Sequence, residues 1–187
     1  LPVPKASPYS RKLASGYGGI NSYPQSTFGK RSSAIQMAYL PPNLYSGIPG
    51  LRLGASRDSV QSFMNKNGLL EKEMHNGWDV WVLKNKKTGK TSLQVYMRDG
   101  MVEAFRIFDS KFVPSSLKIS LDTDIESMKK KFGEPAFILN EPTSGTNTQR
   151  GVKNYVYPVN QVSFQLARND TKSRDIIIKS IFLFKFL

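Results

Sequence analysis

An internal repeat constrains the fold of this chain more than any other feature of its sequence. Segments 60–68 and 125–133 have the same length and layout, with apolar residues at helical spacing and a glycine at the end. A duplicated structural unit leaves such a spacing behind even where its two copies share few identical residues. We therefore expect two units in tandem, the first at residues 51–113 and the second at residues 114–187.

Each unit is predicted to begin with a short amphipathic helix. Apolar positions recur at helical spacing, which gives each helix one face for a core. These positions are Val60, Phe63 and Met64 in the first helix and Ile125, Met128 and Phe132 in the second. Short polar side chains cap helix N-termini, and glycines commonly end helices. The expected caps are Ser56 or Asp58 and Asp122 or Thr123, and the expected stops are Gly68 and Gly133.

Three segments with strand character follow each helix. In the first unit they are residues 78–83, 93–97 and 101–108, and in the second they are 154–159, 162–167 and 176–186. Residues 78–83 are aromatic and β-branched, residues 93–97 alternate between apolar and polar, and Asp99-Gly100 is a typical hairpin turn. In the last segment, simple alternation places Ile176, Ile178, Phe182, Phe184 and Phe186 on one face. The sequence thus predicts an α+β fold of two tandem repeats, each a helix plus a three-stranded antiparallel sheet.

The start of the repeat resembles a known family of small modules. Leu53-Gly54-Ala55-Ser56 is followed by an acidic residue, a valine and a helix, and the second helix ends in Gly133-Glu134-Pro135 before a three-stranded meander. This order resembles the modules of SmpA-type outer-membrane lipoproteins. Two such modules in tandem are similar to the β-lactamase inhibitor protein and to the domains associated with secreted CAP proteins. The resemblance covers residues 51–187, and the chain departs from it at Asn67-Gly68-Leu69, which lacks the proline, and at Ser120, where a glycine is expected.

The resemblance implies an extracytoplasmic protein that binds other proteins and has no catalytic activity. The chain begins at Leu1 rather than at methionine, as expected after removal of a targeting peptide, although a start chosen for expression would look the same. We therefore expect a location in the periplasm, cell envelope or organelle lumen. The apolar stretch at 181–184 lies between two lysines and is far too short for a transmembrane helix, so we expect no transmembrane segment.

Residues 1–50 differ in composition from the rest of the chain. They contain seven prolines, five tyrosines and five basic residues, and no acidic residue. Such a segment is expected to form an extended basic arm rather than a core of its own. Tyrosine and arginine on an extended chain are suited to binding a partner. The predicted partner-binding residues of the arm are Tyr9, Arg11, Lys12, Tyr17, Tyr23, Lys30, Arg31, Tyr39 and Tyr45. Alternatively, the arm covers an edge strand or an apolar face of its own globular body.

A second candidate surface lies on the strands of the first unit. Aromatic and basic residues there could form a stacking platform, although strand alternation lets only some of them face outward. These residues are Trp78, Trp81, Tyr96, Arg98 and Arg106. The chain carries 27 basic and 14 acidic residues, for a net charge of +13. This charge favours an acidic protein surface or a multi-subunit complex as partner, with nucleic acid or an anionic glycan as alternatives, or else a solvated surface without a ligand.

The sequence offers little support for an enzyme. It has one histidine, His75, which is expected in a loop, and it has no cysteine. No Gly-x-Ser-x-Gly motif and no metal-ligand spacing is present. We therefore expect no catalytic residue, no metal and no cofactor. The prediction is a noncatalytic binding or scaffold subunit that docks on a larger protein assembly through the basic arm and an exposed sheet face. The alternative is a nucleic-acid-binding subunit of a ribonucleoprotein.

Overall fold

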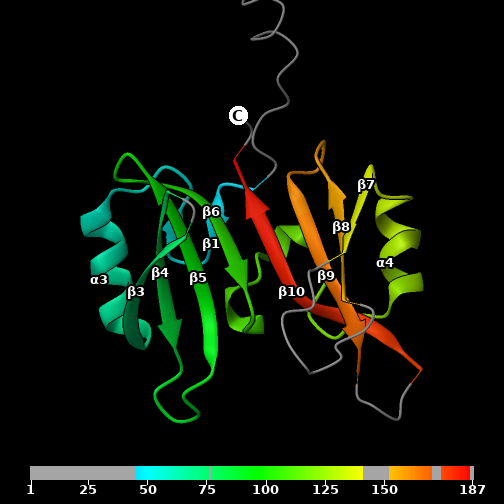
Figure 1. Ribbon diagram of the computed structural model, residues 1–187, viewed down its shortest axis with the longest axis horizontal. Helices are drawn as coiled ribbons and strands as arrows, with labels where there is room; N and C mark the ends of the chain where they lie inside the picture. Colours follow the sequence, from blue (N-terminus) through cyan, green and yellow to red (C-terminus); the bar gives the residue numbers. More distant parts are fainter. Residues whose placement is uncertain (1–44, 76, 141–151, 170–173, 186–187) are drawn as a thin grey trace, which may run out of the picture. The chain divides into compact units, whose positions relative to one another are not determined.

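The computed structural model describes residues 45–75, 77–140, 152–169 and 174–185, which belong to one compact unit. Strands are the main regular structure of this unit (Figure 1). Eight antiparallel strands form one sheet in the order β3-β4-β5-β6-β10-β9-β8-β7. Their bounds are β3 (Leu69–His75), β4 (Trp78–Lys84), β5 (Thr91–Arg98), β6 (Met101–Ile107), β7 (Phe137–Asn140), β8 (Lys153–Tyr157), β9 (Val162–Arg168) and β10 (Ile176–Phe184). A two-stranded sheet, β1 (Gly47–Ile48) and β2 (Leu51–Arg52), precedes them.

The predicted α+β fold of two helix-plus-three-strand repeats is wrong. Helix α3 (Arg57–Asn67) is followed by four strands, and so is helix α4 (Ile125–Phe132). The two groups of strands do not form separate sheets, because β6 and β10 pair along the middle of a single sheet. The prediction missed β3 and β7 for a physical reason. Strand β3 is interrupted by charged residues in its middle and β7 has only four residues, so neither gives a long strand pattern in the sequence.

Local sequence signals placed both helices correctly. The Ser56 side chain accepts a hydrogen bond from the Ser59 amide at the start of α3, which confirms one of its expected caps. At α4 the cap is Asp124, which accepts from the Ser127 amide at 2.8 Å, so the expectation of Asp122 or Thr123 is wrong. A hydrogen bond from the Ser127 hydroxyl, together with this one from the amide, lowers the pKa of Asp124. Gly68 and Gly133 end the two helices as expected.

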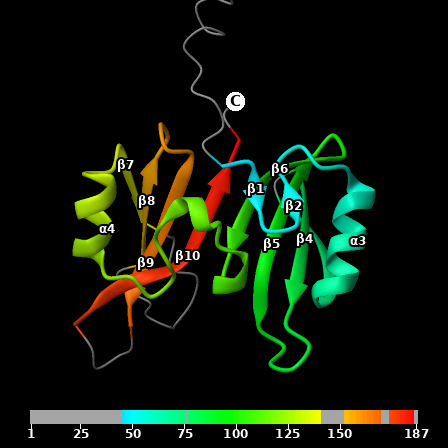
Figure 2. The ribbon, with the colours of Figure 1, turned by 180° about the vertical axis from the view of Figure 1, so that it is seen from behind.

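Both helices pack against the same face of the large sheet, which we call the helix face. The register places Leu93, Ile107, Ile181 and Phe164 in one row across four strands, and all four are buried in the core. The apolar residues of α3 belong to the same core, and Phe132 of α4 contacts the Phe164 ring at 5.0 Å. In Figures 1 and 2, α3 lies beside the β3 end of the sheet and α4 beside the β7 end. One continuous core therefore supports the whole sheet.

A bulge in β10 changes which residues share a face. The pairing of β10 with β9 shifts between Ile178 and Ser180. As a result, Ile178 lies with Ile181 in the core, whereas Phe182 points to the opposite face. The expectation that Ile178 and Phe182 share a face is therefore wrong, because simple alternation cannot anticipate the extra residue of a bulge.

Residues 45–50, which were expected in the arm, belong to the folded body. Tyr45 and Ile48 are buried in the core, and the Ser46 carbonyl accepts a hydrogen bond from the Leu53 amide. Burial also raises the pKa of Tyr45. Tyr45 is therefore part of the core rather than of a partner-binding arm. The other predicted arm residues lie outside the described residues.

Tyr157 makes the stability of the fold depend on pH in the alkaline range. Its hydroxyl donates to the Gly133 carbonyl at 2.9 Å, and burial, helped by the charge of Glu134, raises its pKa to about 12 from 10.0. A tyrosine whose pKa is higher in the folded state stabilises the protein below pH 10 and loses that contribution as the pH rises towards 12. We expect the free energy of unfolding to fall by roughly 2 to 3 kcal/mol across this window.

Urea unfolding followed by circular dichroism at several alkaline pH values measures this fall. The Tyr157→Phe variant should lose most of it, while a smaller fall remains from Tyr45, whose pKa is also raised. An equal pH dependence in the variant and the wild type would show that Tyr157 is not its source.

Candidate functional site

The face of the sheet opposite the helices carries a line of four aromatic rings. We call this surface the groove face. The Trp78 and Tyr96 ring centroids lie 6.4 Å apart, Tyr96 and Phe182 lie 5.5 Å apart, and Phe182 and Phe184 lie 5.9 Å apart. Ala104 on β6 pairs with Tyr96 on one side and Phe184 on the other, and its small side chain leaves room for both rings. The line therefore continues across the junction between β6 and β10.

Two arginines lie along this aromatic line. The Arg98 guanidinium carbon is 3.9 Å from the centroid of the Trp78 ring, and that of Arg106 is 5.3 Å from the Phe108 ring. A guanidinium over an aromatic face is attracted to the ring and keeps its N–H groups at the edge for hydrogen bonding. Arg98 is exposed and Arg106 is half-buried. Cationic donors therefore accompany the apolar rings on this face.

A polar network joins three strands beside the rings. Arg106 Nε donates to the Ser180 hydroxyl at 3.3 Å, and that hydroxyl donates to Gln165 Oε1 at 2.8 Å. Ser180 is only 1% exposed, so its hydroxyl needs these partners. The network fixes the position of Arg106 across the junction of β6, β10 and β9.

Three of the four rings, those of Tyr96, Phe182 and Phe184, line a groove of about 350 Å³ together with the polar network. It runs over strands from both halves of the sheet, from β5 to β7. Aromatic rings bound it near β10, and aliphatic side chains bound it near β7. The lining residues are Tyr96, Arg106, Leu139, Asn154, Val156, Ser163, Gln165, Ser180, Phe182 and Phe184. A groove with apolar walls and a few fixed polar groups is the usual form of a ligand-binding surface.

The binding residues predicted on the strands of the first unit lie on two different faces of the sheet. Trp78, Tyr96, Arg98 and Arg106 lie on the groove face, as described above. Trp81 does not, because it is 1% exposed and points into the core on the helix face. Its Nε1 donates to Asp79 Oδ1 at 3.0 Å. His75 ends β3 instead of lying in a loop.

Sequence reasoning missed the contribution of the second half to this site. Phe182 and Phe184 were recognised as strand residues but not as binding residues. Their signal is the run 180–184, in which polar or aromatic residues alternate with aliphatic ones. The aliphatic residues fill the core while the alternating ones reach the groove. No sequence signal identified Leu139, because it becomes part of the groove only when β7 pairs with β8.

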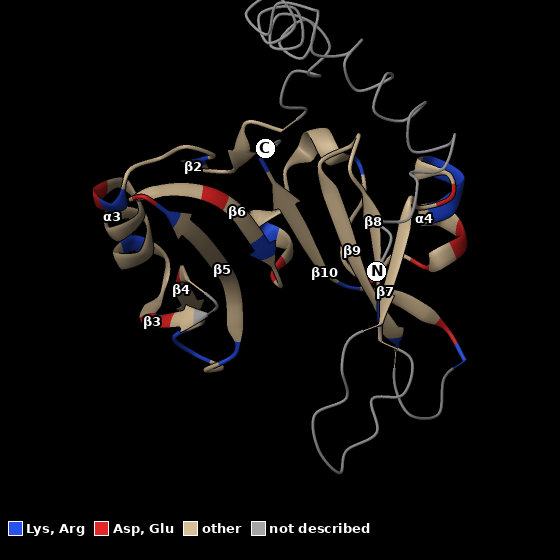
Figure 3. Cartoon of the chain, turned by 45° about the horizontal axis from the view of Figure 1, so that its top comes forward, with Lys and Arg blue, Asp and Glu red and all other residues tan. Residues whose placement is uncertain are grey.

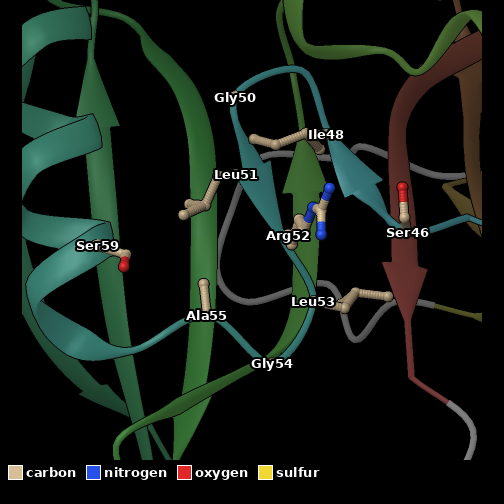
Figure 4. A pocket seen from close by; sticks show the side chains of 9 residues that line it. All are labelled: Ser46, Ile48, Gly50, Leu51, Arg52, Leu53, Gly54, Ala55 and Ser59. Carbon is tan, nitrogen blue, oxygen red and sulfur yellow. The ribbon is translucent and has the colours of Figure 1, made fainter.

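Two other parts of the surface have features of their own: one is rich in basic residues and the other is a second hollow. Within the described residues, basic residues collect at the β4–β5 hairpin and along α4 (Figure 3). A hollow of about 610 Å³ follows the β1–β2 hairpin and the start of α3 (Figure 4). Its lining has one charged side chain, Arg52, and its other residues are apolar, glycine or serine. It therefore lacks the combination of aromatic rings and a hydrogen-bonded arginine, Arg106, that lines the groove.

A metal site and a membrane-spanning helix each have requirements with which the described residues can be compared. In the described parts of the chain, no three residues among His, Cys, Asp and Glu are grouped so that they could hold a metal ion. None of the described helices has both the length and the apolar character needed to span a membrane.

The comparisons with known proteins show a shared fold. No family model matches the sequence, and no curated protein gives a significant match. The structure is similar to that of the uncharacterized protein yfeY from Escherichia coli, with a TM-score of 0.50 and 11% identity over 75% of this chain and 97% of that chain. It is also similar to a DUF4309 family protein (YjgB) from Bacillus subtilis, with a TM-score of 0.45 and 14% identity over 76% and 85% of the two chains. Neither match tests the resemblance to SmpA-type modules, which stays a prediction. The similarity to yfeY places the described body in the same fold and assigns it no activity.

Proposed function

We propose that this protein is a binding subunit that docks on a protein assembly through the groove face of its sheet. The observation that carries this proposal is the line of four rings with two arginines across both halves of the sheet. Tryptophan, tyrosine and arginine are the residues that most often dominate the energy of protein interfaces. Here they lie side by side and are held by neighbouring side chains. Little conformational entropy therefore remains to be lost on binding.

The charge of the chain supports an acidic partner surface. The net charge is +13, and the exposed Arg98 on the groove face has a guanidinium group that can bind a carboxylate through two parallel hydrogen bonds. A field of this sign also increases the rate at which an acidic partner associates. The expected partner surface therefore combines carboxylates with apolar side chains that fit the groove.

Nucleic acid is the alternative ligand, because bases stack on aromatic rings and arginines contact phosphates. The ring geometry favours protein instead. Tyr96 meets Trp78 and Phe182 edge to face, at 81° and 83°, and the guanidinium of Arg98 covers one face of Trp78. These contacts occupy ring surfaces that a base would need for stacking.

Site-specific photocrosslinking in the native cell tests the proposal. We expect p-benzoylphenylalanine at position 182 of the full chain to give a defined protein adduct. The same group at position 62, an exposed serine on α3, is the matched control and should give none. Arg98→Glu should lower the adduct yield about tenfold if the partner surface is acidic. Adducts of equal yield from both positions, or adducts with nucleic acid alone, would contradict the proposal.

A further inference from the structure

Strand β7 forms an unusually apolar edge of the large sheet. It is the last strand in the sheet order, and its described strand neighbour is β8. Phe137, Ile138 and Leu139 are 59%, 48% and 56% exposed. An edge strand presents a row of backbone N–H and C=O groups to which another strand can pair. Three adjacent exposed apolar side chains on such an edge are costly to leave in water.

The opposite edge of the same sheet is protected in the usual way. Strand β3 carries Glu71, Lys72 and Glu73 in its middle, and charges on an edge discourage pairing with another chain. Strand β7 carries no charged residue. The two edges therefore differ in character, which indicates that β7 is built to be covered.

The register connects this edge to the groove. Phe137 pairs with Val156 and Leu139 with Asn154, so both side chains lie on the groove face, and Leu139 lines the groove itself. Ile138 pairs with Tyr155 and lies on the helix face. A strand added at β7 would place every second side chain beside the groove.

We propose that an extended, acidic segment of the partner adds a ninth strand to the sheet at β7 and places its alternate apolar side chains beside the groove. This inference rests on the proposed function and specifies how the partner is held. Main-chain hydrogen bonds to an edge strand supply affinity, and the side chains that alternate onto one face supply specificity.

Charge selects an acidic segment as the occupant. Exposed Lys153 lies opposite Asn140 at the end of β7, and exposed Lys130 lies in the last turn of α4, just before β7. The neighbouring Lys129 is paired with Glu134, and Lys131 Nζ donates to the Leu117 and Lys118 carbonyls. The first fifty residues of the chain contain basic residues and no acidic one, so the same field disfavours them at this edge.

A second copy of the chain fits this edge poorly. Two copies would bring together net charges of +13 each. Strand β7 has four residues, and a paired edge of that length buries far less than the roughly 1,200 Å² typical of a stable interface. A partner segment that continues over the groove gains the remaining contact area there.

A synthetic probe tests this mode of binding on the full chain. The probe is a short fluorescein-labelled peptide of alternating valine and threonine flanked by glutamates. Fluorescence anisotropy should show binding, and a peptide of the same sequence with N-methylated backbone amides should not bind. In hydrogen exchange, the β7 amides of the free protein should exchange faster than those of central β5, and they should become protected when the probe is added.

Lysine substitutions on the β7 edge, compared with one on the β3 edge, test whether the probe binds at β7. Phe137→Lys with Leu139→Lys should weaken probe binding about tenfold. Both side chains are more than half exposed, so the fold should be kept, and an unchanged unfolding temperature checks this. Met74→Lys, at a 71% exposed position on the β3 edge, should leave probe binding unchanged.

Several outcomes would overturn the inference. One is equal probe affinity for the double lysine variant and the wild type. Another is a β7 edge whose amides are as protected as those of β5 in the free protein, which would mean that the chain covers its own edge. A third is a wild-type protein that sediments as a dimer while the double lysine variant sediments as a monomer. If crosslinking from position 182 persists unchanged in the double variant, the strand addition fails while the proposed function stands.

Discussion

Replacing Trp81 with alanine should cost the protein about 3 to 5 kcal/mol of unfolding free energy, the usual cost of truncating a large buried aromatic residue. Trp81 is 1% exposed and lies on the helix face of β4. The change removes the contact of its ring with Lys72 Nζ, 4.2 Å from the centroid, and its hydrogen bond to Asp79. Asp79 would keep its ion pair with Arg57, at 2.7 Å. Urea unfolding followed by far-ultraviolet circular dichroism measures the loss.

Trp78 supplies the matched control, because it lies three residues earlier on the same strand and on the groove face. Trp78→Ala removes a partly exposed ring and should cost about 1 kcal/mol, near the average for a point mutation. The same change should strongly reduce the crosslink from position 182, since it removes one end of the aromatic line. Equal stability losses in the two variants would contradict the assignment of the two tryptophans to opposite faces.

Neither half of the body should fold when the chain is divided into residues 1–113 and 114–187. The two halves meet where β6 pairs with β10, and the pairs there include Ile107 with Ile181 and Phe105 with Leu183, all of them fully buried. Division exposes these side chains. A unit of about sixty residues buries too small a share of its surface to tolerate such a loss. We expect each piece alone to lack a cooperative thermal transition in circular dichroism.

Mixing the two pieces should restore both the transition and the groove, because the groove takes residues from both sides of the junction, such as Tyr96 and Phe182. A piece that unfolds cooperatively by itself would show that the two units predicted from the sequence are independent domains. The intact chain should unfold in one transition, since its described core is continuous.

Four of the binding residues predicted on the strands lie at the candidate site because side chains alternate between the two faces of a strand. They are Trp78, Tyr96, Arg98 and Arg106. Once one residue of a strand is placed on a face, this alternation assigns the others. Trp81 is an odd number of positions from Trp78, so the same rule sends it to the core. Sequence alone could not decide which of the two faces would be covered by the helices.

The second half of the site depended on long-range pairing. Phe182 faces the groove because a bulge precedes it in β10, and Leu139 joins the groove because β7 pairs with β8. A bulge and a four-residue edge strand leave weak local signals. Their positions are set by partners that lie far away in the sequence.

The sequence by itself determined the positions of the two helices, the hairpin at Asp99-Gly100 and most of the central strands. These features depend on contacts between residues close in the chain, such as the bond between Ser56 and the Ser59 amide. Only the tertiary structure decided that the two units share one sheet, that β3 and β7 form its edges, and that the rings align across its centre. The β6–β10 pairing that decides all three joins residues more than seventy positions apart. Its stability comes from burying both strands in a common core, a quantity that no local pattern encodes.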